Sequence, residues 1–241
     1  MIIGPTAVGK SALAIKLASS LDGEIISADS RQVYRGMDIG TEKPSQIDRS
    51  EIPHHLIDVV DPDEPYSLKL FMTQADVSIR NIRNRGKLPI LVGGTGQYIW
   101  SLIEGWDVPK VPPDTKLRSC LEEQARSLGI NRLYEQLAHL DPEAAERIDS
   151  RNLRRVVRAL EVRLSSESHA TPTTHTVPMI KDARIIGLRL NRQLLYGRVD
   201  TRVEKMIQSG WINETESLLD KGYSPNLPSM SGIGYRELVQ Y

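Results

Sequence analysis

Short apolar runs alternate along this chain with longer segments in which apolar residues recur every three or four positions. The runs that predict buried strands lie at residues 1–3, 24–28, 54–60, 89–92 and 183–190. Helical periodicity, with capping residues at several ends, follows at residues 10–21, 67–83, 194–209 and 212–221. Strands that alternate with helices of this length indicate an α/β fold, in which helices cover both faces of a parallel sheet.

The strand signal stops after Trp106 and returns near residue 183. Residues 108–113 contain three prolines and are typical of a linker, and residues 114–164 are helical throughout. We therefore expect a core formed by residues 1–107 and 183–241 and an all-helical insert at residues 108–182. Residues 165–178 are rich in Ser, Thr, His and Pro, which predicts an exposed, mobile loop at the end of the insert.

Composition narrows the class of protein without choosing a function. The 241 residues carry 31 basic and 31 acidic side chains, so a nucleic-acid partner would need a local basic patch rather than a basic protein. The single cysteine, Cys120, excludes an intramolecular disulfide. Neither a signal peptide nor an apolar run of membrane-spanning length is visible. We expect a cytoplasmic monomer with no membrane partner.

The first chemical motif matches G-x-x-x-x-G-K-[ST] and stands between a predicted strand and a predicted helix, the context that this motif requires. Its residues are Gly4, Pro5, Thr6, Ala7, Val8, Gly9, Lys10 and Ser11. The glycines let backbone N–H groups face one anion at the positive end of the helix. Lys10 adds a full charge, and the Ser11 hydroxyl is placed for Mg²⁺. The motif predicts phosphate binding but leaves a nucleoside triphosphate and a diphosphate ester equally open.

A carboxylate, Asp29, follows the second predicted strand. The carboxyl ends of parallel strands line the ligand crevice, so we expect Asp29 near the phosphate loop. There it could act as a general base, contact Mg²⁺ or cap the following turn, and position alone does not choose between these roles. The next residues, Ser30, Arg31 and Gln32, carry polar side chains that could recognise the edge of a base.

Two further strand ends offer weaker candidates. Asp58 follows the third predicted strand and faintly resembles the Mg²⁺-binding aspartate of nucleotide hydrolases, although its apolar lead-in is short. The fourth strand ends in Gly93-Gly94-Thr95-Gly96 without an acid. Small residues there leave room for a ligand to approach the backbone, and Thr95 offers a hydroxyl.

The insert concentrates arginines on one helix. Arg151, Arg155 and Arg158 share a helical face, and most arginines between residues 147 and 163 lack nearby acids, Asp149 and Glu161 excepted. This pattern favours a nucleic-acid phosphate contact over a plain solvated face. The opposite stripe predicts core packing and consists of Leu153, Val156, Val157, Leu160 and Leu164. In the core, Arg198 and Arg202 also share one face of a predicted helix.

Seven segments together resemble one family, the tRNA dimethylallyltransferases or tRNA isopentenyltransferases. They are residues 4–11, 27–34, 36–44 (Gly-Met-Asp-Ile-Gly-Thr-Glu-Lys-Pro), 53–58, 91–98, 158–162 and 232–237. The resemblance implies a P-loop-kinase-like core that transfers a dimethylallyl group from dimethylallyl diphosphate, with Mg²⁺, to the exocyclic amine of the adenosine 3′ of the anticodon. The implied partner is the tRNA anticodon stem-loop.

The resemblance also implies a role for individual residues. Asp29 matches the general base, Thr95 a residue of the reaction channel, and Arg198 and Arg202 arginines near the diphosphate that Lys10 also binds. The implied tRNA contacts are Asp29, Ser30, Arg31, Gln32, Thr95, Arg154, Arg155, Val156, Val157 and Arg158.

Three rival functions remain open at this level. The motifs also fit a small-molecule P-loop kinase with Arg198 and Arg202 as lid arginines on ATP, or prenyl transfer to free adenine nucleotides. A nucleotide-dependent binding module is the rival outside catalysis. The arginine-rich insert is the feature that favours tRNA over a free nucleotide.

Overall fold

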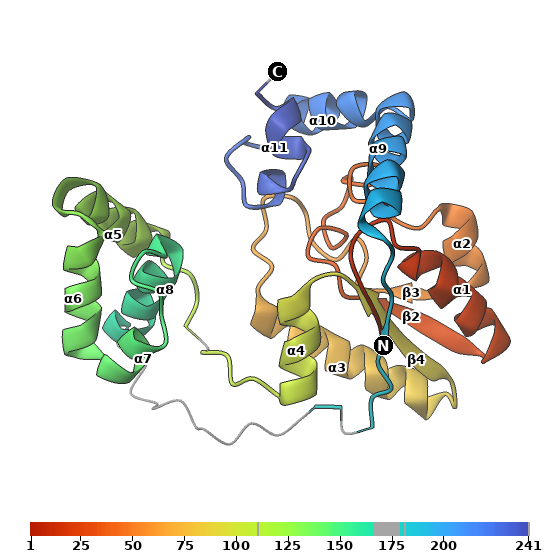
Figure 1. The fold of residues 1–241 in the computed structure, drawn as a ribbon, viewed down its shortest axis with the longest axis horizontal. Coiled ribbons are helices and arrows are strands. Elements are labelled where there is room, and N and C mark those ends of the chain that lie inside the picture. The colour runs from red at the N-terminus through yellow and green to blue at the C-terminus, as the bar shows by residue number, and fades with distance from the viewer. Residues whose placement is uncertain (110, 166–178, 181, 241) are drawn as a thin grey trace. The chain divides into compact units, whose positions relative to one another are not determined.

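The computed structural model describes residues 1–109, 111–165, 179–180 and 182–240 (Figure 1). Contacts divide the chain into two compact units, one formed by Met1–Trp106 with Val177–Tyr241 and the other by Asp107–Thr176. The boundaries expected at residues 107/108 and 182/183 lie near these divisions. Apart from Ser165, the loop that the sequence predicts as mobile lies outside the described residues.

The larger unit, called the core unit below, contains a five-stranded sheet in the order β3-β2-β4-β1-β5. Every neighbouring pair is parallel, which confirms the expected α/β fold. The strands are β1 Ile2–Ile3, β2 Gly23–Ser27, β3 His54–His55, β4 Leu88–Gly93 and β5 Ile186–Gly187. The central strands β2 and β4 are the longest, and their buried residues form the middle of the core.

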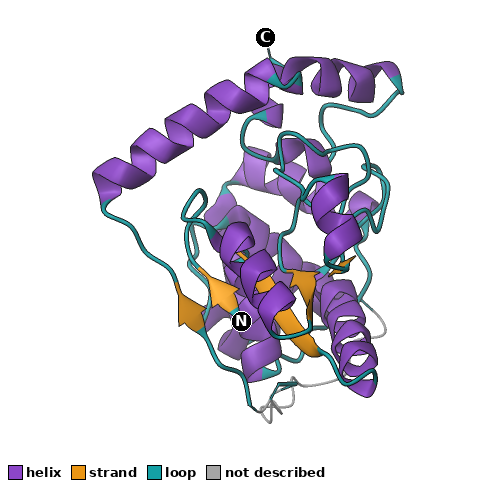
Figure 2. Ribbon diagram, turned by 90° about the vertical axis from the view of Figure 1, so that its right-hand side faces the viewer, coloured by secondary structure: helices purple, strands orange, loops and turns teal. Residues whose placement is uncertain are grey.

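Helices cover both faces of this sheet (Figure 2). On one face, α1 (Lys10–Ser20) packs Ala14 and Ala18 against Ile25 and Ile90. On the other, α3 (Leu68–Asn84) contacts β2 and β4 and also packs against α4 (Gly96–Glu104). Because side chains alternate along a strand, β2 and β4 can bury apolar residues towards both helical layers.

Several local expectations were wrong, each for a physical reason. The buried face of α1 is formed by the small residues Ala14 and Ala18, and the helix ends at Ser20, so Leu21, the last residue of the periodic segment, is 54% exposed. The strand expected at residues 54–60 ends at His55, because Leu56 and Asp58 adopt left-handed backbone conformations that a strand cannot contain. Only residues 186–187 of the 183–190 run form a strand, although the Leu188 N–H also donates to the Ile3 carbonyl. Neither α2 (Gln46–Glu51) nor α4 was anticipated.

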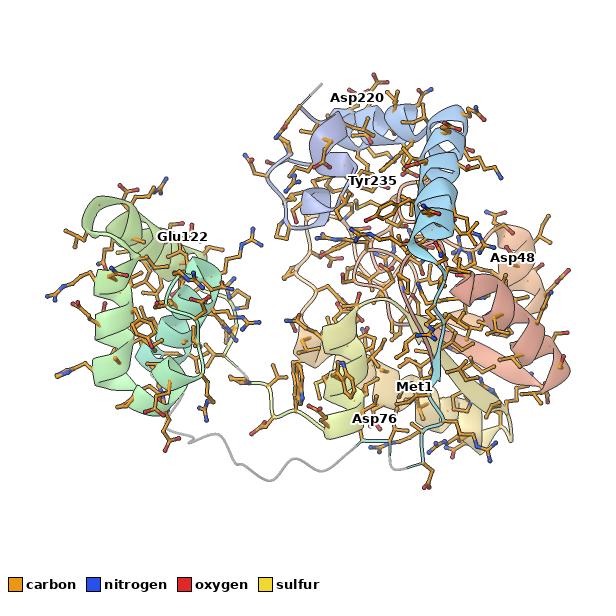
Figure 3. The ribbon with its side chains drawn as sticks, viewed as in Figure 1. Met1, Asp48, Asp76, Glu122, Asp220 and Tyr235 are labelled. Carbon is orange, nitrogen blue, oxygen red and sulfur yellow. The ribbon has the colours of Figure 1, made fainter. Side chains whose placement is uncertain are left out.

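The remaining helices of the core unit pack beside the loop that follows β2. They are α9 Arg192–Gln208, α10 Trp211–Asp220, the 3₁₀ turn Ser229–Ser231 and α11 Tyr235–Leu238. Tyr235, labelled in Figure 3, packs edge-on against Trp211, with ring centroids 5.5 Å apart. Glu214 of α10 accepts hydrogen bonds from the Tyr235 hydroxyl and from the backbone N–H groups of residues 38–40. A Cβ atom on Gly40 would lie 2.0 Å from Trp211 Nε1, so this packing requires a glycine.

The smaller unit, called the helical unit below, contains α5 Thr115–Leu128, α6 Ile130–Leu140, α7 Pro142–Glu146 and α8 Leu153–Leu164. Asp114 caps α5 and Asp141 caps α7, each through a side-chain oxygen that accepts from N–H groups of the first turn. Glu161 is buried between helices, where its carboxylate accepts hydrogen bonds from the Asp114 N–H, Arg118 and Arg158. This carboxylate therefore joins the start of α5 to α8. No helix in the described part of either unit is long and apolar enough to cross a membrane.

Candidate active site

The phosphate loop joins β1 to α1 and depends on unusual backbone conformations. Gly4 and Gly9 have φ angles of 151° and 101°, and a Cβ on Gly4 would lie 2.6 Å from the Leu188 carbonyl oxygen. Among the described residues, no side chain caps the N-terminus of α1. The N–H groups of its first turn are therefore available to an anion, which the helix dipole also favours.

Lys10 lies at the mouth of this loop, where its Nζ donates a 2.8 Å hydrogen bond to the Pro5 carbonyl. Burial lowers the pKa of the Lys10 amine, the negative charge of Asp29 opposes that shift, and Arg202 adds to it. These influences require the three charged groups to be near one another. A second cation beside Lys10 is unfavourable unless an anion, such as a phosphate, is bound between them.

A cavity of about 70 Å³ in the core unit brings several of the predicted site residues together, although Thr95 does not line it. Lys10 and Ser11 line it from the phosphate loop, Asp29 from the segment after β2, and Arg202 from α9. The remaining lining residues are Thr6, Ala14, Ile25, Ser27, Gln32, Thr41, Glu42, Pro44, His54, Ile57, Val92 and Gly93. A carboxylate, two cations and a hydroxyl thus converge at the carboxyl ends of β1, β2 and β4, as expected of a parallel sheet.

Asp29 caps the turn that follows β2. Its Oδ1 accepts hydrogen bonds from the N–H groups of Arg31, at 2.8 Å, and Gln32, at 3.4 Å. Capping of this turn was one of the roles that the sequence left open for Asp29, and the structure shows this cap. Both bonds use the same oxygen, however, so the carboxylate retains Oδ2 as a second acceptor. The cap and a proton-accepting role are therefore compatible, and the cap would hold the carboxylate still.

The ends of β2 and β4 approach each other closely next to Asp29. The Ser30 N–H donates a 3.1 Å hydrogen bond to Thr95 Oγ1, which joins the Asp29 turn to the turn that begins α4. A Cβ atom on Gly93 would lie only 2.1 Å from the Ala28 carbonyl oxygen. The glycine at this strand end is thus required by contact between two backbones. Thr95 orients the turn that carries Asp29.

Arg31 and Gln32 use their side chains within the protein. Arg31 donates to the carbonyl oxygens of Pro228 and Ser229 and to the Ser231 hydroxyl. Gln32 accepts from the Ser27 hydroxyl and donates to the carbonyl oxygens of residues 41 and 42. Either side chain would have to exchange these bonds before it could bind a base.

The two arginines of α9 lie in different surroundings. Arg202 Nη1 donates to Thr6 Oγ1 of the phosphate loop at 2.7 Å and pairs with Glu42 at 2.8 Å. Arg198 is exposed and lines a neighbouring groove of about 930 Å³, not the cavity. The structure thus brings Arg202 to the phosphate loop and leaves Arg198 about one helical turn away from it.

Asp58 does not fit the Mg²⁺-binding role that its position after β3 suggested. Strand β3 lies at the edge of the sheet, with β2 and β4 between it and the phosphate-loop strand β1. Asp58 pairs instead with Lys43 at 2.5 Å and Arg49 at 2.6 Å. Burial alone would raise the pKa of this carboxyl, but hydrogen bonds from the two cations outweigh it and lower the pKa. Asp58 therefore anchors the loop between β2 and β3.

The predicted tRNA-binding segment of α8 divides into exposed and buried residues. Arg154 and Arg155 are exposed, and their side chains make no ion pair among the described residues. Arg158 pairs with Glu161 and donates to the Val111 carbonyl. Val156 and Val157, which the resemblance implied as tRNA contacts, are buried in the core of the helical unit, as the apolar stripe predicted.

The expectation that the arginines lack acidic partners was also wrong in part. Besides Arg151, which pairs with Asp149, Arg163 pairs with Asp141 at 2.5 Å. The aspartate lies far from Arg163 in sequence, so the local pattern could not reveal the pair.

Sequence reasoning missed several cavity residues, among them Thr41, Glu42 and His54. Thr41 and Glu42 lie in the segment of residues 36–44 that resembles the family, but its pattern does not indicate a role for either residue. His54 Nδ1 donates a hydrogen bond to the Ile52 carbonyl, 2.7 Å away. Burial lowers its pKa, which favours the neutral ring. No periodicity or spacing distinguishes these residues, because their position depends on how the loop after β2 folds back.

The parallel sheet, the phosphate loop and the converging charges define a P-loop protein built to bind a phosphorylated substrate. Comparison with known proteins identifies the family. A family model described as IPP transferase matches residues 32–241, and one described as isopentenyl transferase matches residues 1–52. The chain belongs to the tRNA dimethylallyltransferase family of prenyltransferases, which confirms the resemblance seen in the motifs.

Individual relatives are similar over the whole chain. The tRNA dimethylallyltransferase of Roseiflexus sp. (strain RS-1) is 50% identical over 240 residues, covering 100% of this chain and 79% of that protein. The full-length tRNA isopentenylpyrophosphate transferase of Bacillus halodurans is 40% identical with a TM-score of 0.66. The match covers 100% of this chain and 75% of that protein. A eukaryotic dimethylallyltransferase whose structures were solved as it acts on tRNA is 31% identical with a TM-score of 0.80. The match covers 99% of this chain and 61% of that protein.

Proposed function

We propose that this protein transfers a dimethylallyl group from dimethylallyl diphosphate to the exocyclic amine of the adenosine 3′ of the anticodon in tRNA, releasing diphosphate. One observation carries the proposal: Lys10 of the phosphate loop and Asp29 line the same cavity. A prenyl transfer needs an anion site for the leaving group and a proton acceptor for the amine. Membership of the tRNA dimethylallyltransferase family supports this function over phosphoryl transfer.

The phosphate loop and its two cations would stabilise the leaving group. As the bond between the allylic carbon and the diphosphate oxygen breaks, the electron pair leaves with the diphosphate and negative charge grows on it. Lys10 and Arg202 line the cavity next to the uncapped start of α1, which supports a role for both cations and the α1 N–H groups in binding that charge. Preorganised donors of this kind lower the barrier, because they need no rearrangement as charge develops.

Asp29 would accept the proton that the amine loses. The adenine nitrogen attacks the allylic carbon, and the new N–C bond leaves the nitrogen positively charged until a proton departs. Asp29 Oδ2 is the acceptor, because Oδ1 holds the turn. To reach the cavity the base must leave its stack, which costs a few kcal/mol and least in a single-stranded loop. An adenosine of the anticodon loop meets this requirement.

Mg²⁺ fits this site as a partner of the diphosphate. The exposed Ser11 hydroxyl lines the cavity beside the loop, and hydroxyl and phosphate oxygens suit this hard cation. The described residues hold no cluster of three acids, histidines or cysteines that would bind a metal without substrate. Ser11 and the diphosphate oxygens would therefore hold the ion together. When bound, Mg²⁺ would neutralise part of the diphosphate charge.

The helical unit would contact the tRNA backbone. Arg154 and Arg155 offer exposed guanidinium groups on α8, and phosphates bind such groups through paired hydrogen bonds. Near the reacting base, the segment from Asp29 to Gln32 and Thr95 would form the wall of the adenine site. The protein would act on the tRNA anticodon stem-loop as a cytoplasmic monomer.

The test uses the full chain with Mg²⁺, dimethylallyl diphosphate and an unmodified anticodon stem-loop. Mass spectrometry of the RNA should show an increase by one dimethylallyl group at the adenosine 3′ of the anticodon, together with released diphosphate. Parallel reactions contain AMP, or ATP without the allylic substrate. If AMP is prenylated and the RNA is not, the acceptor is a free nucleotide and not tRNA. ATP consumption with unmodified RNA would establish a kinase and end the proposal.

A further inference from the structure

Arg202 owes its position to two acceptors on different parts of the core unit. Its Nη1 bonds Thr6 Oγ1 of the phosphate loop and pairs with the carboxylate of Glu42. The Arg202 side chain is 20% exposed, so its guanidinium is largely enclosed between these partners. Arginine has five N–H donors, and two acceptors leave donors free for a ligand. Glu42 and Thr6 can thus keep their contacts while Arg202 binds a phosphate.

Glu42 itself is held in an uncommon backbone conformation. Its φ angle is 51°, in the left-handed region that residues with a side chain seldom adopt. Its N–H donates to the Ile39 carbonyl, and its own carbonyl accepts from Gln32 Nε2 at 3.1 Å. A strained residue persists only where its surroundings determine it, and such residues concentrate at functional sites. Here the conformation points the carboxylate towards α9.

Gln32 extends the connection to the proposed base. Its Oε1 accepts from the Ser27 hydroxyl at 2.8 Å, and its backbone N–H donates to Asp29 Oδ1. Hydrogen bonds therefore run without a break from Asp29 through Gln32 to Glu42, and the ion pair continues them to Arg202. The group that would accept the proton and the group that would bind the leaving diphosphate belong to one network.

Charge gives Glu42 a second effect. Lys10 and Arg202 repel each other, and the Glu42 carboxylate lies near enough to both to offset that repulsion. Glu42 and Arg202 also line both the cavity and the adjoining groove of about 930 Å³. The ion pair therefore stands where the two spaces meet, and it keeps the arginine at the phosphate loop before any anion arrives.

We propose that Glu42 is a positioning residue, which orients Arg202 over the leaving diphosphate and links that arginine to the Asp29 turn through Gln32. This role rests on the proposed prenyl transfer. Misplacing a group that stabilises developing charge slows the chemical step, and errors of about 1 Å cost up to ~10²-fold. Glu42→Ala should lower kcat by about 10- to 30-fold and leave the KM for tRNA within about twofold. Glu42→Gln, which keeps a hydrogen-bond acceptor, should lose less.

A double-mutant cycle with Arg202→Ala tests whether Glu42 acts through the arginine. If it does, Glu42→Ala should slow the Arg202→Ala enzyme by less than about twofold, because the group that it orients is absent. If the double variant instead lost kcat by the product of the two single losses, the two residues would act independently and the proposal would be overturned. Asp61→Ala is the control, since Asp61, about as exposed as Glu42, pairs at 3.2 Å with Arg35 in the same unit. It should leave kcat unchanged.

Two further measurements separate this proposal from its alternatives. Thermal unfolding should shift by no more than about 2 °C in Glu42→Gln, as for other surface ion pairs. A kcat loss in Glu42→Gln that instead followed a large stability loss would assign Glu42 a structural role. Calorimetry can measure the affinity of the wild type, the two single variants and the double variant for inorganic diphosphate. This second form of the cycle does not require turnover. If the wild type failed to prenylate tRNA, the proposed function would fall, while non-additive diphosphate binding would still establish Glu42 as the residue that positions Arg202.

Discussion

Replacing Asp29 by asparagine separates its two roles in the structure. Asparagine keeps an Oδ1 atom that can accept from the N–H groups of Arg31 and Gln32, so the turn after β2 should survive. It removes the basic oxygen that would accept the amine proton. General-base catalysis contributes about 10²–10⁴-fold, which corresponds to roughly 2.7–5.4 kcal/mol of barrier. We therefore expect Asp29→Asn to lose about that factor in kcat.

If Asp29 only caps the turn, the Asp29→Asn and Asp29→Ala variants should differ in kcat. Alanine removes both hydrogen bonds to the turn, worth about 1 kcal/mol each, so loss of the cap alone would slow the enzyme at most about 30-fold. In that case Asp29→Asn would remain close to wild type and only Asp29→Ala would suffer. If Asp29 is the base, both variants lose 10²-fold or more.

The assay is single-turnover transfer of labelled dimethylallyl diphosphate to an anticodon stem-loop, with enzyme in excess. Calorimetry with inorganic diphosphate provides the control, and both variants should bind it with nearly wild-type affinity, because Asp29 is not a phosphate ligand. An Asp29→Asn enzyme within threefold of wild type would remove this carboxylate from the chemistry and leave it as a cap.

Three other substitutions test the site and its supports. Gly93→Ala should lower the unfolding free energy by about 3 kcal/mol or more, because its Cβ would meet the Ala28 carbonyl; Gly197→Ala, in open space on α9, should not. Glu161→Gln should cost about 2 kcal/mol, less than a fully buried pair, because its arginine partners are one-third exposed. Arg155→Ala should reduce the salt slope of tRNA binding by nearly 1, whereas Arg126→Ala, in an exposed pair on α5, should leave it unchanged. Normal melting of the first two variants, or an unchanged slope in the third, would contradict these expectations.

Glu161 also makes the stability of the helical unit depend on pH. Burial raises the pKa of this carboxyl, but hydrogen bonds from Arg118, Arg158 and the Asp114 N–H outweigh burial and lower it. A depressed folded pKa means that the stabilisation is complete above the unfolded value, about 4.3, and is lost as the pH falls through the folded pKa. Denaturation followed between about pH 5 and 3 should show this loss in the wild type and a shallower loss in Glu161→Gln.

The sequence predicted the parts of the site that depend on local structure. The phosphate loop is set by residues 4–11 themselves, so both its conformation and its charge could be anticipated. Asp29 could be placed beside it because the ends of neighbouring parallel strands meet. Capping by Asp114 and Asp141 was equally local.

Features that depend on distant parts of the chain could not be predicted. The weaker candidate Asp58 could not be judged from the sequence, because strand order is not readable from strand spacing, and β3 is an edge strand. Arg31 seemed free, but its acceptors lie 197–200 residues away. The pair between Arg163 and Asp141 joins residues 22 positions apart, so the local pattern of charges could not reveal it. Glu42 has no sequence signal, since its importance comes from a loop conformation.

The packing of Trp211 between two glycines ties the far end of the chain to the reaction centre. A Cβ on Gly40 or on Gly234 would overlap the Trp211 ring, while Glu214 holds the backbone next to Gly40. Gly40 lies two residues before Glu42, so loosening this interlock would disturb the arginine at the phosphate loop. Substitutions at these three positions should therefore depend on one another. A smaller side chain in place of Trp211 would leave room for a larger residue at Gly40 or Gly234. Their evolutionary histories should be correlated, although Gly40 lies 171 residues before Trp211 and 194 residues before Gly234 in the chain.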